Sequence, residues 1–303
     1  EEKPDALVCI DYPGFNMKLI EKAKEAGIPV IYYILPTIWA WHKSRGNVIA
    51  EYTDLAVSLF PFEAEMYKKM GTNVVYGGHP LLDTVKPSMS KDEAYSFFGL
   101  QQGKKTVLFM PGSRVQEVQS LYGKMLAAGK LLQDKVEGLQ FMVPKASTID
   151  RHMLEEAARE ANLEVHIGEE RVYDMMNIAD AAICASGTAT LETALMGVPT
   201  LLVYRVNALT YWLSKILVHL DSIGLPNIIS GHRIMPELWQ DEVTPENIEA
   251  AVLPWLVDAA ASEEARHLMA GVRCQMGEAG AVRRTAEIIS EFVKEKQLHE
   301  AVQ

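Results

Sequence analysis

A chain of 303 residues is long for one hydrophobic core and ordinary for two domains of about 150 residues each, so we expect two domains. Hydrophobic residues make up 49% of the chain and charged residues 23%, values that exclude a disordered or fibrous protein. The formal net charge of -11 argues against a nucleic-acid partner, because a surface that tracks phosphates needs clustered Lys and Arg.

The first third of the chain alternates short apolar runs with helix-period segments. This alternation is typical of parallel strands joined by crossover helices, and it predicts an α/β fold. Because the chain opens almost directly on a strand, with no initiator Met, we expect its true N-terminus to be missing. The predicted strands span residues 6–10, 28–34, 55–60 and 73–76.

Asp11 follows the first predicted strand and precedes Tyr12, Pro13 and Gly14. Pro13 ends the strand and leaves the carboxylate at its tip, where it could remove a proton from an attacking hydroxyl group as a general base. The alternative, which the local sequence by itself favours, is an Asp that caps the helix starting near Gly14.

A polar, turn-rich stretch follows the fourth strand and is suited to a linker. We therefore predict an N-terminal domain over residues 1–90 and a second domain over residues 91–280. His79, which lies in this turn, is a minor candidate for a cleft between the domains; a hydrogen-bonded structural histidine is the alternative.

A second α/β series starts at residue 106, and from residue 244 onward the pattern is almost entirely helical. We expect the last segment, residues 281–303, to be a helix that packs back on the first domain. The predicted strands of this series span residues 106–110, 139–143, 164–167, 181–185 and 200–204.

Two strand ends in the second domain are suited to phosphate. Ser186, Gly187 and Thr188 follow one strand and open a helix, where N–H groups and the helix dipole favour an anion. Ser186 or Thr188 could cap this helix, and Glu192 could face sugar hydroxyl groups; a plain capped helix is the alternative. Arg114, in the turn after the strand at 106–110, offers a forked, permanently charged partner for a diphosphate, and a surface arginine is its alternative.

Two aromatic and apolar stretches with basic residues, 39–43 and 211–218, could lie in a membrane interface, although ordinary packing between domains is the favoured interpretation of each stretch by itself. The histidines and the three cysteines show no metal-ligand spacing, so we predict neither a metal site nor a disulfide framework. No stretch reaches the roughly 18 uninterrupted apolar residues of a membrane span.

Taken in order, these motifs resemble the lipid-A-disaccharide synthase family of inverting glycosyltransferases, over nearly the whole chain. The motifs that carry the resemblance are residues 10–16, 39–41, 60–63, 78–81, 111–114, 185–192, 210–213 and 225–227. The resemblance implies a GT-B fold with two Rossmann-like domains and a helical C-terminus. It also implies a cytoplasmic enzyme, bound peripherally to the inner membrane, that needs no cofactor and no metal.

The reaction that the resemblance implies joins two acylated sugars. 2,3-Diacylglucosamine passes from its UDP-activated form to 2,3-diacylglucosamine 1-phosphate, giving the β-1,6-linked lipid A disaccharide and UDP. Asp11 would deprotonate the acceptor hydroxyl group, and Glu192 would hold the ribose of the donor. The residues implied around the UDP diphosphate are Arg114, Ser186, Gly187, Thr188 and Asn227.

Two departures from the family pattern leave other interpretations open. The family usually has a second Asp where this chain has Gly14, and it has further elements before the first strand seen here. The alternatives are another UDP-sugar enzyme of the same scaffold, such as an epimerase or a glycosyltransferase for peptidoglycan precursors, or an impaired UDP-sugar-binding remnant.

Overall fold

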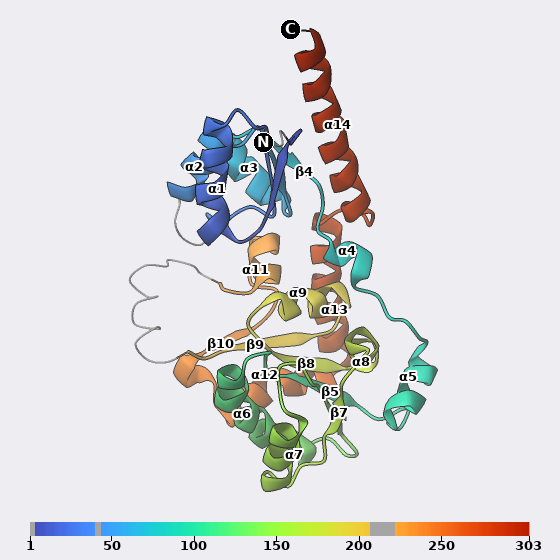
Figure 1. The fold of residues 1–303 in the computed structure, drawn as a ribbon. Coiled ribbons are helices and arrows are strands. Elements are labelled where there is room, and N and C mark those ends of the chain that lie inside the picture. Colours follow the sequence, from blue (N-terminus) through green and yellow to red (C-terminus); the bar gives the residue numbers. More distant parts are fainter. Residues whose placement is uncertain (1–3, 40–43, 207–221, 303) are drawn as a thin grey trace. The chain divides into compact units, whose positions relative to one another are not determined.

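The computed structural model describes residues 4–39, 44–206 and 222–302 of the chain (Figure 1). Two compact units are present. The first comprises the chain up to Thr84 together with Gln275–Gln303, and the second comprises most of Val85–Cys274. The predicted stretch 211–218 and residues 40–43 of the stretch 39–43 lie outside the described residues.

The first unit is built on a four-stranded parallel sheet with the order β1-β2-β3-β4. Its strands follow one another in the chain, so each connection is a crossover of the βαβ type. The elements are β1 (Leu7–Ile10), α1 (Pro13–Glu25), β2 (Val30–Tyr33), α2 (Ser44–Tyr52), β3 (Leu55–Ser58), α3 (Pro61–Lys69), β4 (Val74–Tyr76) and α4 (Leu81–Thr84).

The C-terminal helix α14 (Ala281–Val302) belongs to this first unit. Asp83 holds its start, because the carboxylate accepts hydrogen bonds from the N–H groups of Gly280, Ala281 and Val282. These bonds keep the pKa of Asp83 below its ordinary value. One face of the sheet packs on this helix through Ile31, Leu55, Val57, Ile288, Ile289, Phe292 and Val293. On the opposite face, Tyr32 of β2 belongs to a core with residues of the first helices, including Ile20 and Tyr67.

The second unit contains a six-stranded parallel sheet with the order β10-β9-β8-β5-β6-β7. Its elements are α5 (Lys91–Phe98), β5 (Thr106–Met110), α6 (Val115–Gln133), β6 (Gln140–Pro144), α7 (Arg151–Glu160), β7 (His166–Gly168), α8 (Val172–Ile178), β8 (Ala181–Ala185), α9 (Thr188–Leu195), β9 (Thr200–Tyr204), α11 (Leu225–Ser230), β10 (Glu237–Trp239), a 3-10 turn (Gln240–Glu242), α12 (Pro245–Val257) and α13 (Ala259–Gln275).

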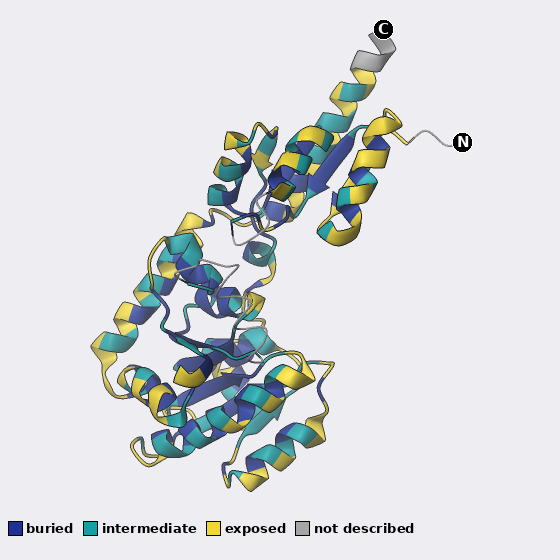
Figure 2. Ribbon diagram, turned by 90° about the vertical axis from the view of Figure 1, so that its left-hand side faces the viewer, coloured by how far each residue is buried: buried dark blue, intermediate teal, exposed yellow. Residues whose placement is uncertain are grey.

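Both faces of the central strands in this sheet are covered. Every residue of β5 and of β8 is buried, which is why these strands appear in the sequence as unbroken apolar runs. Figure 2 shows the buried residues gathered on the strands and on the helix faces turned toward them, with exposed residues on the outer helix faces. Among the described helices, none is long and apolar enough to cross a membrane.

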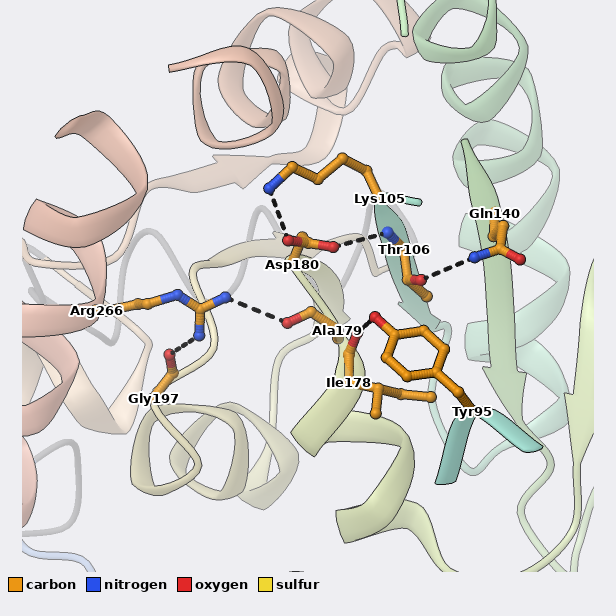
Figure 3. Close-up of polar contacts among 9 residues, drawn as sticks. All are labelled: Tyr95, Lys105, Thr106, Gln140, Ile178, Ala179, Asp180, Gly197 and Arg266. Carbon is orange, nitrogen blue, oxygen red and sulfur yellow. Dashed lines mark hydrogen bonds and ion pairs between the residues drawn. The ribbon is translucent and has the colours of Figure 1, made fainter. Parts of the chain in front are cut away.

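A polar network fastens the amino ends of β5 and β8 (Figure 3). The carboxylate of Asp180 accepts hydrogen bonds from the Nζ of Lys105 at 2.8 Å and from the N–H of Thr106 at 2.9 Å. The guanidinium of Arg266, on α13, donates to the carbonyl groups of Gly197 and Ala179 at 2.9 and 3.4 Å. With the amino ends of the strands tied in this way, the carboxyl ends remain available for ligand contacts.

The predicted α/β fold with two parallel sheets and a helical C-terminus is confirmed. Three strands, β5, β8 and β9, have the predicted bounds. Strand β10 was not predicted, because it has three residues and its first, Glu237, is a buried carboxylate.

Candidate active site

A cavity of about 550 Å³ opens at the carboxyl ends of β5, β6 and β8 in the second unit. Its walls come from four connecting segments, each of which directly follows a strand of the same sheet. Five of the residues predicted for the donor meet here, namely Arg114, Ser186, Gly187, Thr188 and Glu192. The position agrees with the general rule that ligands of open α/β sheets bind beyond the carboxyl ends of the strands.

The turn after β8 presents the uncapped start of α9 to the cavity. Gly187 is the N-cap residue, with φ at 154°, and no side chain caps the helix. The prediction that Ser186 or Thr188 caps α9 is therefore wrong. The helix starts one residue after a glycine whose backbone conformation is nearly closed to other residues. The N–H of Thr190 donates to the carbonyl group of Gly187, whereas the N–H groups of Thr188 and Ala189 have no partner among the described residues and can bind an anion.

The turn after β5 is organised by Glu117, which the sequence analysis did not single out. Its Oε2 accepts hydrogen bonds from the N–H groups of Ser113 and Arg114 at 3.2 and 3.3 Å. Its Oε1 lies 2.6 Å from the guanidinium of Arg114, whose side chain is 80% exposed. A Cβ atom at Gly112 would come within 2.4 Å of the Glu117 carboxylate, so this turn requires glycine. The spacing of Glu117, three residues after the N-cap of α6, is the signal that could have predicted it.

Glu192 lines the same cavity one turn into α9. Its Oε1 accepts a hydrogen bond of 2.8 Å from the hydroxyl group of Tyr173, on α8. The carboxylate is half-buried and thereby held at the wall of the cavity, where it has capacity to accept further hydrogen bonds.

The cavity is also lined by charged residues that were not predicted from the sequence. Lys145 follows β6, and Glu169, Glu170 and Arg171 follow β7. The guanidinium of Arg171 donates to the hydroxyl group of Ser88 at 2.9 Å. Their places after two predicted strands were a usable signal, but nothing in the sequence fixed the direction of these side chains.

Asn227 lies in the second unit but does not line this cavity. Its Nδ2 donates to the carbonyl group of Met235 and to Glu237, and its Oδ1 accepts from the N–H groups of Ile234 and Met235. All of the side chain's bonding positions are thus used within the protein. The buried amide fastens α11 to the segment before β10.

Asp11 lies in the first unit, directly after β1. Its side chain is exposed, and its carboxylate makes no hydrogen bond with any other described residue. The N-cap residue of α1 is Tyr12, with no side-chain cap, so the alternative in which Asp11 caps the helix is excluded. The carboxylate is therefore free to accept a proton.

His79 is buried in the first unit beside Phe60, with 5.1 Å between the ring centroids. Its Nδ1 accepts a hydrogen bond of 3.1 Å from the N–H of Leu81. Burial lowers the pKa of His79 to about 4, so the imidazole is neutral at pH 7, with its proton on Nε2.

Glu63 is a buried carboxyl group that the sequence analysis named only within a motif. It lies in the first turn of α3, and its Oε2 accepts a long hydrogen bond of 3.4 Å from the N–H of Leu59. Burial raises the pKa of Glu63 to about 7.

Within the described residues, no group of three or more His, Cys, Asp and Glu side chains is placed to hold a metal ion.

The raised pKa of Glu63 predicts a pH-dependent stability. Between its ordinary value of 4.5 and about 7, the folded protein keeps a proton that the unfolded chain has released, so stability falls as the pH rises through this window. We expect Glu63→Gln to remove a loss of about 2 kcal/mol in the free energy of unfolding between pH 5 and pH 8. Urea unfolding at both pH values measures this loss. Glu65→Gln, which changes an exposed residue of the same helix, is the control. If the free energy of unfolding fell by the same amount between pH 5 and pH 8 in both variants, the prediction would be contradicted.

Comparison with known proteins gives a consistent family. The family model described as Lipid-A-disaccharide synthetase matches residues 1–292. The lipid-A-disaccharide synthase of Geobacter metallireducens is 43% identical over 294 residues, which cover 97% of this chain and 77% of the relative. That of Geobacter sulfurreducens is 40% identical over 290 residues, covering 96% and 76%.

Solved structures with the same fold are UDP-sugar proteins of much lower identity. The S. aureus MnaA-UDP co-structure superposes with a TM-score of 0.66 at 15% identity, covering 96% of this chain and 77% of that one. The UDP-GlcNAc 2-epimerase from Neisseria meningitidis bound to UDP-GlcNAc gives 0.63 at 13% identity, covering 95% and 77%. These likenesses support the predicted GT-B architecture and do not by themselves distinguish a transferase from an epimerase. The family model and the relatives do make that distinction, and by them the chain belongs to the lipid-A-disaccharide synthase family.

Proposed function

We propose that this protein transfers 2,3-diacylglucosamine from UDP-2,3-diacylglucosamine to 2,3-diacylglucosamine 1-phosphate, giving the lipid A disaccharide 1-phosphate and UDP. The observation that carries the proposal is the cavity in the second unit, where a forked cation, an uncapped helix start and a half-buried carboxylate line one space. Each of these groups suits one part of a sugar nucleotide.

The donor half of the reaction rests on electrostatics. Departure of UDP puts negative charge on the diphosphate, and charge-assisted donors that are already in place lower the barrier. The guanidinium of Arg114 and the N–H groups of Gly187 and Thr188, at the start of α9, are such donors. The N–H of Ser186 is bonded to the carbonyl group of Val203, so Ser186 would donate through its hydroxyl group. Glu192 accepts hydrogen bonds, so it suits the ribose hydroxyl groups. The side chain of Asn227 is already saturated, and we assign it a structural part in this half.

The acceptor half rests on Asp11, whose free carboxylate would take the proton of the acceptor's 6-hydroxyl group as that oxygen attacks the sugar. Apolar side chains surround it. Ile10, Tyr12 and Phe15 are 57%, 69% and 56% exposed, and the last two rings stack at 6.3 Å. Exposed apolar residues beside a catalytic group suit an acylated substrate better than a fully polar one.

The same exposed residues support peripheral association with the inner membrane from the cytoplasmic side. Both substrates carry acyl chains and reside in a bilayer, so the enzyme has to work at a membrane surface. Ile10, Tyr12 and Phe15 form an apolar surface of the kind that inserts into the interfacial region of a bilayer.

Product analysis tests the proposed reaction. The protein is supplied with both diacylglucosamine substrates, and disaccharide and UDP are expected in equal amounts. An altered sugar nucleotide without disaccharide would indicate an epimerase, and bound UDP without any product would indicate a binding remnant. Either result would overturn the proposal.

A further inference from the structure

The turn that carries Asp11 has an unusual backbone. Asp11 and Tyr12 have φ values of 49° and 45°, so two successive residues other than glycine adopt the left-handed conformation. Residues with a Cβ atom rarely adopt this backbone conformation, and such strain persists only where the surrounding structure enforces it. The groups that enforce it are therefore informative.

Two buried side chains converge on the carbonyl oxygen of Asp11. The Nδ2 of Asn16 donates to it at 2.7 Å, and the hydroxyl group of Tyr32 donates at 2.8 Å. Asn16 comes from α1 and Tyr32 from β2, so the turn is held from two elements. Asn16 is 9% exposed and Tyr32 is 0% exposed, so both donors are buried, while Asp11 itself is exposed.

These bonds are more than the usual satisfaction of buried polar groups. The hydroxyl group of Tyr122, equally buried in the second unit, has no hydrogen-bond partner among the described residues, so a bond at such a position is not obligatory for packing here. A carbonyl oxygen that accepts two side-chain donors has its peptide plane fixed, and with it the direction of the Cα–Cβ bond of the same residue. Since the carboxylate of Asp11 has no hydrogen bond of its own within the described part of the chain, its direction depends on the backbone.

We propose that Asn16 and Tyr32 are positioning residues that aim the Asp11 carboxylate at the acceptor hydroxyl group. The inference rests on the proposed role of Asp11 as the base. It goes further in assigning the accuracy of that base to two buried hydrogen bonds, neither of which touches substrate.

Tyr32→Phe removes only the hydroxyl oxygen, and with it one of the two hydrogen bonds to the Asp11 carbonyl group. We expect kcat to fall by roughly 10–100-fold, because a small misplacement of a catalytic group costs about this much. The KM for the donor and the Kd for UDP stay unchanged, and the pH–rate profile keeps the limb set by the base. Tyr122→Phe is the matched control and changes kcat less than twofold. Asn16→Ala removes the other bond, together with a longer one of 3.3 Å from Nδ2 to the carbonyl group of Ile10, and is expected to act in the same direction.

A double-mutant cycle separates positioning from general loosening of the fold. Tyr12→Gly relieves one of the two left-handed residues, so less force is needed to hold the turn. The loss of kcat caused by Tyr32→Phe should therefore be smaller in the Tyr12→Gly background than in the parent. Equal losses in the two backgrounds would contradict the proposed restraint.

The outcomes distinguish this inference from the proposed function. Should Asp11→Asn leave turnover intact, Asp11 is not the base, and the proposed mechanism fails whatever Tyr32→Phe does. Should Asp11→Asn abolish turnover while Tyr32→Phe and Asn16→Ala behave like Tyr122→Phe, the base stands and the positioning role is wrong.

Discussion

Asp11→Asn is expected to lower turnover by roughly 10²–10⁴, the usual contribution of a general base, while the Kd for UDP stays unchanged. An amide has the shape of the carboxylate but cannot take up the acceptor's proton. Because the Asp11 side chain makes no hydrogen bond with the rest of the described chain, its replacement should leave the turn and the fold intact. Initial rates of UDP release and calorimetric titration with UDP measure the two quantities.

The design separates chemistry from binding, since UDP contacts are assigned to the second unit and Asp11 belongs to the first. Asp134→Asn, an exposed carboxylate at the end of α6 outside the cavity, is the control and should alter neither quantity. Normal turnover by Asp11→Asn in the full chain would remove Asp11 from the mechanism.

The fold was predictable wherever burial leaves a simple trace in the sequence. Strands β5 and β8 are buried on both faces, so their bounds follow directly from unbroken apolar runs. Strand β2 is shorter than predicted, because the apolar run at residues 28–34 continues into connecting segments at both ends. Strand β10 leaves no such trace, because its first residue is the buried Glu237 rather than an apolar one. The Glu237 carboxylate tolerates burial because it accepts hydrogen bonds from Gly224, Asn227 and Trp239.

The site was predictable only in part, for a physical reason. Glycine turns and helix starts are visible as local patterns, and the structure brings Gly187 and Arg114 to one cavity. The supports of these groups are set by tertiary geometry. Glu117 acts through a turn whose conformation depends on Gly112, and Tyr32 reaches Asp11 from another strand. Asn227 illustrates the converse, because a motif residue proved to be saturated by its own neighbours.

The departure at Gly14 has a structural meaning as well. A Cβ atom there would meet nothing within 4 Å, so packing does not require glycine at this position. The first turn of α1 also contains no acidic residue. The carboxylate that the resemblance implies at this position is thus absent, and the proposed mechanism assigns proton removal to Asp11 without it.

Arg114→Ala is expected to weaken UDP binding by roughly 10–150-fold, equivalent to the 1.5–3 kcal/mol of one charge-assisted hydrogen bond. The side chain is 80% exposed and forms an ion pair with Glu117 at the surface, so its removal costs the fold little. The turn itself survives, because Glu117 still accepts the N–H groups of Ser113 and residue 114. Calorimetric titration with UDP measures the loss.

Glu117 decides how that loss should be interpreted. Once the guanidinium of Arg114 is gone, the Glu117 carboxylate faces the diphosphate without a counter-charge. Repulsion between these two negative groups then adds to the lost attraction. Arg114→Ala combined with Glu117→Gln removes the repulsion, so binding should recover in part and the residual deficit is the guanidinium's own contribution. Arg283→Ala is the control. It breaks a comparable ion pair on α14, in which the Nε of Arg283 lies 2.8 Å from the carboxylate of Glu287 and the arginine side chain is 86% exposed. This variant should leave the Kd for UDP unchanged. If Arg114→Ala bound UDP as tightly as this control, the diphosphate would have to be held by the start of α9 without Arg114.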